Sequence, residues 1–261
     1  MRTWSLIRFY TLLVYLFMFT PIAIVVVLSF NDAQFGGFPI QGFSLRWFEA
    51  LADNEPVVRA FRTSMLMGIA AAVIATTLGI LASLALMRYN VRGTNFLNTL
   101  LISPVLVPET VLAVGLLLFM RWLDQPRSLV LLLAGHVLIA LPFVVLVVQA
   151  RLVGIRKVYE DAARSLGANP VQTFFQITFP LLMPAVFAGL LFAFTISFDN
   201  ITGTLFWRPP GVETVPTQIF GMLRHSISPE INALGTVMIV ITVGLPLLAG
   251  AAARAFARGR L

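Results

Sequence analysis

Long runs of apolar residues, separated by short polar stretches, recur along the whole sequence. A run of about 20 such residues can cross a hydrocarbon core about 30 Å thick as an α-helix. Six runs reach this length, and they occupy residues 9–30, 63–87, 96–120, 128–150, 184–206 and 231–253. The pattern predicts an all-α, polytopic membrane protein in which a single domain, residues 1–261, contains six transmembrane helices.

Three connections between these runs are longer than a turn. Residues 31–62 and 207–230 would lie on one side of the membrane, and residues 151–183 on the other. The first run follows Arg2 and Arg8, as in a secretory signal, but its apolar stretch is too long and no small-residue cleavage site follows it. We therefore interpret it as a first transmembrane helix that is retained.

The composition agrees with a membrane protein and excludes several other classes. Hydrophobic residues make up 59% of the chain and charged residues 11%, with a mean hydropathy of +0.92. Soluble domains contain about 25% charged residues, so a water-soluble globule is excluded. The chain has no cysteine, which excludes disulfides and thiolate metal sites. His136 and His225 are isolated from other ligand-type residues, and no Ser/His/Asp grouping suggests catalysis.

The formal net charge of +7 is explained by membrane topology. Of the 18 Lys and Arg residues, eleven fall at the two termini and in the loops after the second and fourth runs, alongside only two acidic residues, Glu160 and Asp161. The alternate side holds seven basic and seven acidic residues. Because Lys and Arg are enriched in cytoplasmic loops, both termini are predicted to be cytoplasmic. No nucleic-acid-binding motif accompanies the positive charge.

The long loop 151–183 predicts a bent pair of short helices. Helix-forming residues extend from about residue 157 to 166, and Gly167 then supplies the left-handed position that commonly ends a helix. Asn169 and Pro170 are suited to start a second helix. The first helix would present small and charged residues to a groove on a partner, and Phe174, Phe175 and Ile177 would anchor the second helix to the membrane domain. The alternative is an amphipathic loop that packs only on its own bundle.

This loop resembles the cytoplasmic signature of permease subunits from ATP-binding-cassette (ABC) importers. The signature residues are matched at the expected spacing by Asp161, Ala162, Ala163, Gly167, Ile177 and Pro180. Asp161 stands where glutamate is usual, and Phe179 where leucine is usual. The resemblance implies a type I ABC importer permease fold with a cytoplasmic coupling-helix loop at 151–183. It also implies contact with an ATPase through Glu160, Asp161, Ala162, Ala163, Arg164, Gly167 and Pro180.

Further stretches resemble the permeases of spermidine/putrescine-type importers. These stretches are Phe43–Leu51, Phe61–Ser64, Ser103–Phe119, Ser197–Asn200 and Val215–Leu234. The segment Ile201–Thr214 departs from that pattern. The resemblance implies movement of a small organic solute across a bacterial inner membrane, with polyamines as the leading class and amino-acid derivatives or opines as alternatives.

The resemblance also implies partners, because this chain has no motor of its own. A phosphate-binding loop needs a Gly-Lys-Ser/Thr sequence, but Lys157 is the only lysine and follows Arg156. ATP and magnesium would therefore bind to a separate dimer of ATPase subunits, and this chain would bind no cofactor. The other implied partners are a second, homologous permease, an extracytoplasmic solute-binding protein and the lipid bilayer.

Two carboxylates lie inside the apolar runs, where charged residues usually face a cavity or a partner. Thr195, Asp199 and Thr202 recur at helical spacing and predict a polar stripe on the fifth helix. With neighbouring aromatic residues such as Phe198, Asp199 is a candidate binding point for an organic cation. Alternatively, Asp199 pairs with a neighbouring helix or caps a helix break near Asn200.

Glu109 follows Pro104 and Pro108, which are expected to break the third helix. Its role is then either structural, at the kink or near the interface, or direct contact with solute. Trp207 is expected at the outer membrane interface, where tryptophan is enriched, with a role in gating the pathway as an alternative. A stripe of small residues on the second helix predicts close packing of a neighbouring helix. Its members are Ala71, Ala75, Gly79 and Ser83.

Two rival classes remain. An ion-coupled secondary transporter could use the intramembrane carboxylates to bind protons or sodium ions, but it would favour inverted halves with paired broken helices, which the sequence does not display. A membrane-embedded enzyme would need clustered catalytic residues, which are also not apparent. Both rivals are less consistent with the cytoplasmic signature than an importer permease is.

Overall fold

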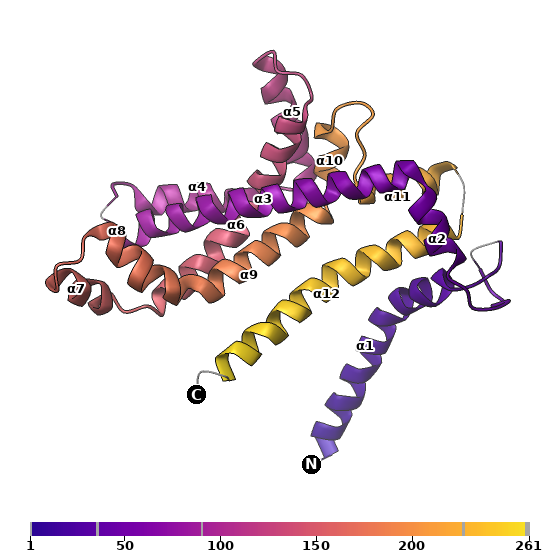
Figure 1. The fold of residues 1–261 in the computed structure, drawn as a ribbon, viewed down its shortest axis with the longest axis horizontal. Helices are drawn as coiled ribbons and strands as arrows, with labels where there is room; N and C mark the ends of the chain where they lie inside the picture. Colours follow the sequence, from indigo (N-terminus) through magenta and orange to yellow (C-terminus); the bar gives the residue numbers. More distant parts are fainter. Residues whose placement is uncertain (1, 35–36, 90, 226–227, 259–261) are drawn as a thin grey trace.

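The computed structural model of the chain describes residues 2–34, 37–89, 91–225 and 228–258 (Figure 1). Over these residues the fold is helical, and the only β-type pairing is an isolated bridge between Asn31 and Phe43. The helices, in chain order, are α1 (Arg2–Ser29), α2 (Arg46–Asp53), α3 (Glu55–Arg88), α4 (Thr94–Leu106), α5 (Glu109–Trp122), α6 (Leu129–Val153), α7 (Val158–Ser165), α8 (Pro170–Thr173), the π-helical turn η1 (Phe174–Thr178), α9 (Phe179–Phe198), α10 (Thr202–Trp207), α11 (Val215–His225) and α12 (Glu230–Arg258).

Five helical segments are long and apolar enough to cross a membrane: within α1, α3, α6, α8 to α9, and α12. A sixth crossing is possible where α4 and α5 together pass the same test, although they are bent by 110° at a short break. The all-α, multi-pass fold class is therefore confirmed. Two predicted spans differ in detail: 96–120 is two helices rather than one, and 184–206 is interrupted after Phe198, because the chain leaves the helix before α10 begins.

The core of the fold is formed by α3, α6 and α9, which pack tightly against one another. The small-residue stripe of α3 allows this approach, since Ala71, Ala75 and Ser83 have no exposed surface. A Cβ added to Gly79 would lie 2.6 Å from Val144 Cγ1 of α6, so only glycine fits between these helices. The predicted close packing of a neighbouring helix on this stripe is confirmed.

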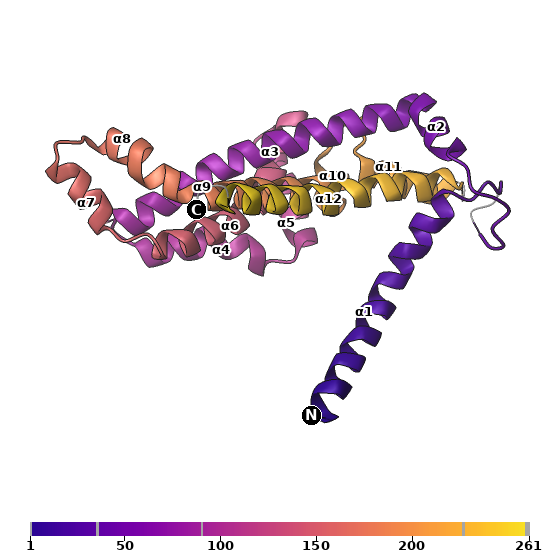
Figure 2. The same cartoon turned by 60° about the horizontal axis from the view of Figure 1, so that its bottom comes forward.

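Helix α1 stands apart from this core (Figures 1 and 2). It packs on α12 near its carboxyl end and then diverges, so that only 6% of its most apolar window is buried. Large apolar side chains such as Phe17 and Tyr10 are mostly exposed along it. The apolar surface of α1 is thus available to lipid or to a second membrane-spanning chain.

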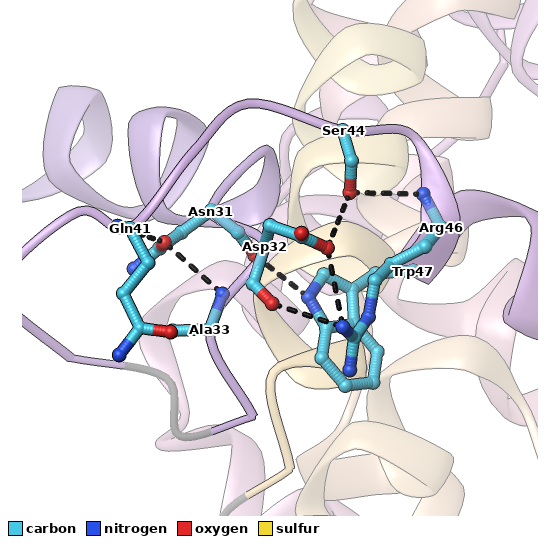
Figure 3. Close-up of polar contacts among 7 residues, drawn as sticks. All are labelled: Asn31, Asp32, Ala33, Gln41, Ser44, Arg46 and Trp47. Atoms are coloured by element: carbon cyan, nitrogen blue, oxygen red, sulfur yellow. Dashed lines mark hydrogen bonds and ion pairs between the residues drawn. The ribbon is translucent and has the colours of Figure 1, made fainter.

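The loop between α1 and α2 is held by a compact set of polar contacts (Figure 3). The side-chain oxygen of Asn31 accepts hydrogen bonds from the backbone N–H groups of Ala33 (3.2 Å) and Gln41 (3.1 Å). Arg46 forms an ion pair with Asp32 at 3.1 Å and stacks over the Trp47 ring, whose Nε1 donates to the carbonyl of Asn31. These contacts fix the path of the chain where α1 joins α2.

Figure 1 shows α7 and α8 at one end of the molecule and α2 and α11 near the other. The two ends correspond to the loops predicted on opposite sides of the membrane. The candidate functional residues fall into two regions, one at the α7 end and one at the break between α9 and α10.

Candidate functional sites: an elbow between α7 and α8 and an intramembrane hollow

The first site is the bend between α7 and α8, which we call the elbow (Val158 to Thr173). Gly167 has φ +91°, a backbone conformation that side chains with a Cβ rarely adopt. The N–H of Gly167 donates to Arg164 O and that of Ala168 to Ala163 O, both at 3.0 Å, which closes α7. The predicted helix end at Gly167 is confirmed.

The second half of the elbow begins with a capping box. The side chain of Asn169 accepts from Gln172 N at 2.9 Å, and the side chain of Gln172 accepts from Asn169 N at 3.0 Å. Pro170 occupies the first helical turn, where its missing N–H leaves no bond unmade. The sequence therefore predicted this helix start correctly, from Asn169 and Pro170.

A hollow of about 810 Å³ lies between α7 and the segment that follows the elbow. It is lined by residues of α7, η1 and α9, among them Tyr159, Ala162, Ala163, Leu166, Ile177 and Pro180. The side chain of Leu166 is 90% exposed, although it is apolar. A concave surface with small residues on one wall and an exposed leucine at its edge is suited to receive a protein segment.

One predicted member of this surface, Glu160, lies elsewhere. Glu160 is only 3% exposed, because its carboxylate turns inward and pairs with Arg88 at 3.0 Å, so its assignment to the docking surface is wrong. Asp161 and Arg164 are exposed, as predicted. Phe174 packs against the core, but Phe175 is 61% exposed and does not anchor the elbow within this chain.

The second site is an intramembrane hollow of about 600 Å³ at the α4–α5 bend. Its walls are the turn from Pro104 to Pro108, part of α6, and the break between α9 and α10. Glu109, Asp199 and Thr202 all line it, although Glu109 is far from the other two residues in the sequence. The helix break predicted from Pro104 and Pro108 is confirmed, and the 110° bend creates the space.

Asp199 directly follows the last residue of α9, and its N–H donates to Thr195 O at 3.0 Å. The side chain is exposed to the hollow, and no described residue donates a hydrogen bond to its carboxylate or forms an ion pair with it. The predicted continuous stripe of Thr195, Asp199 and Thr202 is wrong, because α9 ends at Phe198, before Asp199 and Thr202. Thr195 is half-buried on α9 and does not line the hollow.

Glu109, the first residue of α5, connects the α4–α5 bend to the break between α9 and α10. Its Oε1 accepts hydrogen bonds from Asn200 Nδ2 at 2.5 Å and from Gly203 N at 3.1 Å. The carboxylate therefore stabilises the start of α10, where backbone N–H groups lack helical partners. This is the structural role at the kink, and it also places the charge of Glu109 on the wall of the hollow.

Phe198 and Trp207 do not reach the hollow in this conformation. Phe198 is 1% exposed and stacks on Phe194 in the core. Trp207 is fully buried, so its expected position at the membrane interface is wrong. Its Nε1 donates to Ala113 O of α5 at 2.9 Å, which provides the polar partner that a buried indole requires.

A buried hydrogen-bonded triad near the hollow was not predicted. The ring nitrogens of His136 lie 2.6 Å from Ser197 Oγ and 3.0 Å from Thr204 Oγ1. These contacts connect α6 to α9 and α10, on both sides of the break. The partners are 61 and 68 residues away in sequence, so no local spacing could have indicated them.

Trp207 also leads to a prediction about stability. The indole ring lies directly against Gly135 of α6, and a Cβ added there would overlap the ring. Gly135→Ala should therefore lower the free energy of unfolding by about 1–3 kcal/mol, the usual effect of overpacking. Thermal unfolding of the purified protein in detergent would measure the change.

Gly115→Ala on α5 is the matched control, since a Cβ there meets nothing within 4 Å. The control should unfold at the same temperature as the native protein or slightly above it, because alanine favours helix over glycine. Equal stability of Gly135→Ala and the native chain would contradict the described packing of Trp207.

Comparison with known proteins identifies the family to which this chain belongs. Residues 75–260 match the family described as the binding-protein-dependent transport system inner membrane component. The chain is 35% identical over 246 residues to the spermidine/putrescine transport system permease protein PotC of Escherichia coli (94% of this chain, 93% of the relative). It is 32% identical to the putrescine transport system permease protein PotI of Escherichia coli (87% and 83% covered).

Among solved structures, the fold is similar to a chain from the crystal structure of a bacterial ABC transporter involved in import of the acidic polysaccharide alginate. The TM-score is 0.77 at 16% identity, with 97% of this chain and 96% of that chain covered. The relatives are transport permeases of the bacterial inner membrane rather than enzymes. This chain is accordingly a membrane-spanning permease subunit of an ABC importer, and it belongs to the family of binding-protein-dependent transport system inner membrane components.

Proposed function

We propose that this permease imports a polyamine, and that the intramembrane hollow is a binding point for the cation on its path. The observation that carries the proposal is the carboxylate of Asp199, which faces the hollow without a described partner, beside the charge of Glu109. An unpaired carboxylate inside a membrane domain is unfavourable unless water or a cation reaches it. The names of the two Escherichia coli relatives favour the same solute class.

The shape of the hollow suits an extended organic cation. Thr202 can donate a hydrogen bond or accept one, and Phe143 adds an aromatic side chain to the lining. The remaining lining is largely apolar, from Leu106, Leu112 and Ile139. Such a surface would bind the methylene segments between ammonium groups weakly enough for the solute to leave again.

Energy would come from an ATPase dimer that binds ATP and magnesium and docks at the elbow. Exposed Asp161 and Arg164 lie on the same helix as Ala162 and Ala163, which line the hollow, so a complementary segment of the ATPase could contact them as it enters. Closure of the ATPase dimer would move α7 and shift the helices between inward-facing and outward-facing arrangements.

A second permease and a solute-binding protein would complete the complex. The exposed apolar surface of α1 would be covered by the second permease and by lipid. The loop from Asn31 to Trp47, fixed by its polar contacts, would face the binding protein on the outer side (Figure 3). Both termini would then be cytoplasmic.

The proposal is tested by reconstituting the complete complex in proteoliposomes and measuring ATP-dependent uptake from a solute panel. The panel contains spermidine, putrescine, an opine, an amino-acid derivative and a dicarboxylate. Uptake of polyamines that stops without ATP supports the proposal. Uptake of anions alone contradicts the cation role of Asp199, and uptake driven by an ion gradient without ATP contradicts the importer mechanism.

A further inference from the structure

A buried ion pair lies at the elbow and is not part of the docking surface. Arg88 is the last residue of α3, and Glu160 lies in the first turn of α7. Arg88 Nε lies 3.0 Å from Glu160 Oε1, and the two side chains are only 13% and 4% exposed. Charges this well shielded from water are stable only while both partners and their hydrogen bonds are present.

The ion pair also forms hydrogen bonds with residues outside α3 and α7. Arg88 Nη2 donates to the carbonyls of Leu152 at 3.4 Å and Ile155 at 2.7 Å, where α6 ends. Thr178, at the end of η1, donates its hydroxyl to Glu160 Oε1 at 3.1 Å. One cluster of polar atoms therefore connects α7 to α3, to α6 and to the beginning of α9, which are the three helices of the core.

Few other contacts could hold α7 in place. In the described part of the chain, α7 otherwise packs chiefly on α8, within the elbow, and on η1, which directly follows it. The π-helical form of η1 is also notable, since such turns are uncommon and occur frequently at functional sites. Without the ion pair, α7 could move relative to α3 and α6 while the core stayed packed.

We propose that Arg88, Glu160 and Thr178 form a rigid link that transmits movement of α7 to the core helices. The inference rests on the proposed coupling of the elbow to an ATPase. Arg88 and Glu160 are positioning residues: they touch neither the solute nor the ATPase, and they act by holding α7 at a fixed distance from α3. Loss of the link lets ATP hydrolysis proceed without transport.

The test measures the ATP hydrolysed per solute imported in the reconstituted complex. Arg88→Met and Glu160→Gln should raise this ratio by about 10-fold, within the range of typical coupling energies, while the ATPase still co-purifies. Arg92→Met is the matched control, because Arg92 is exposed in the loop that follows α3, and its ratio should not change. A normal ratio in Arg88→Met and Glu160→Gln overturns the proposal, as does loss of ATPase co-purification in these variants.

A double variant separates coupling from folding. A single substitution leaves one buried charge unpaired and destabilises the chain, whereas Arg88→Met with Glu160→Met removes both charges and should restore stability. The link predicts that this double variant stays uncoupled although it is stable. Recovery of coupling together with stability would show a purely structural role and overturn the proposal.

A distance measurement gives an independent readout. The chain has no cysteine, so spin labels can be placed at Leu81 of α3 and Ser165 of α7, both exposed. The distance should be the same with and without ATP in the otherwise native complex, and should spread in the Glu160→Gln background. A change with ATP in the native background overturns the link.

Failure of the proposed function would give a different result, because the native complex itself would then show no ATP-driven uptake. Asp161→Asn offers a further contrast, since Asp161 is exposed and should weaken ATPase co-purification rather than coupling.

Discussion

Asp199→Asn is expected to lower ATP-driven polyamine uptake by about 10- to 100-fold. Hydrogen bonds to charged groups contribute about 1.5–3 kcal/mol, and each 1.4 kcal/mol corresponds to about a tenfold change in affinity. Asparagine keeps the size of the side chain but loses the charge, while Glu109 still holds the start of α10 through Asn200. Uptake in proteoliposomes against solute concentration would show whether the loss is in affinity or in rate.

The control for this substitution is Asp53→Asn, which removes the same charge from an exposed position at the end of α2. It should transport normally. Asp199→Glu retains the charge and should keep most of the activity. If Asp199→Asn took up spermidine within about twofold of the native rate, the proposed role of the hollow would be wrong.

Gly167→Val is the second large expected effect, with uptake lowered by about 10-fold or more and membrane insertion intact. Open space surrounds the position, since a Cβ added there meets nothing within 4 Å. The penalty is therefore in the backbone: a β-branched residue at φ +91° costs about 1–3 kcal/mol. The elbow relieves that strain by changing its bend, and a changed bend displaces α7 relative to α8.

Two variants make this result specific. Gly167→Asn should retain most of the uptake, because asparagine tolerates positive φ better than valine. Gly93→Val imposes comparable strain at φ +77° in the loop before α4, where a Cβ also meets open space. If Gly93→Val lowered ATP-coupled uptake as much as Gly167→Val, the effect would reflect general destabilisation rather than the elbow.

Features encoded in local sequence were predictable, and the elbow is the clearest example. Gly167, Asn169 and Pro170 act within a few residues of chain, so their pattern alone indicated the helix end and the next helix start. The small-residue stripe of α3 was predictable for a related reason, since its period matches one helix face whatever the neighbouring helix is.

Features that depend on distant partners were not predictable. The sequence places Glu160 beside Asp161 and Arg164, but Arg88, 72 residues away, turns its carboxylate inward. Trp207 follows an apolar run and is typical of a membrane interface, yet Gly135 and Gly203 leave room for its ring inside the fold. A helix break near Asn200 was one of two alternatives from the sequence, but hydropathy alone did not select it, because Leu205, Phe206 and Trp207 continue the apolar run beyond the polar residues.

The bend between α4 and α5 has a consequence for hydration. The last four carbonyl groups of a helix lack amide partners within it, and Pro108 brings no N–H to the end of α4. Such groups cannot face hydrocarbon, where each unsatisfied one costs several kcal/mol, so we expect water in the hollow to bond those that protein groups leave free. A charged amine arriving beside Asp199 would then meet water already present in the hollow, and it would not have to lose its whole hydration shell at once.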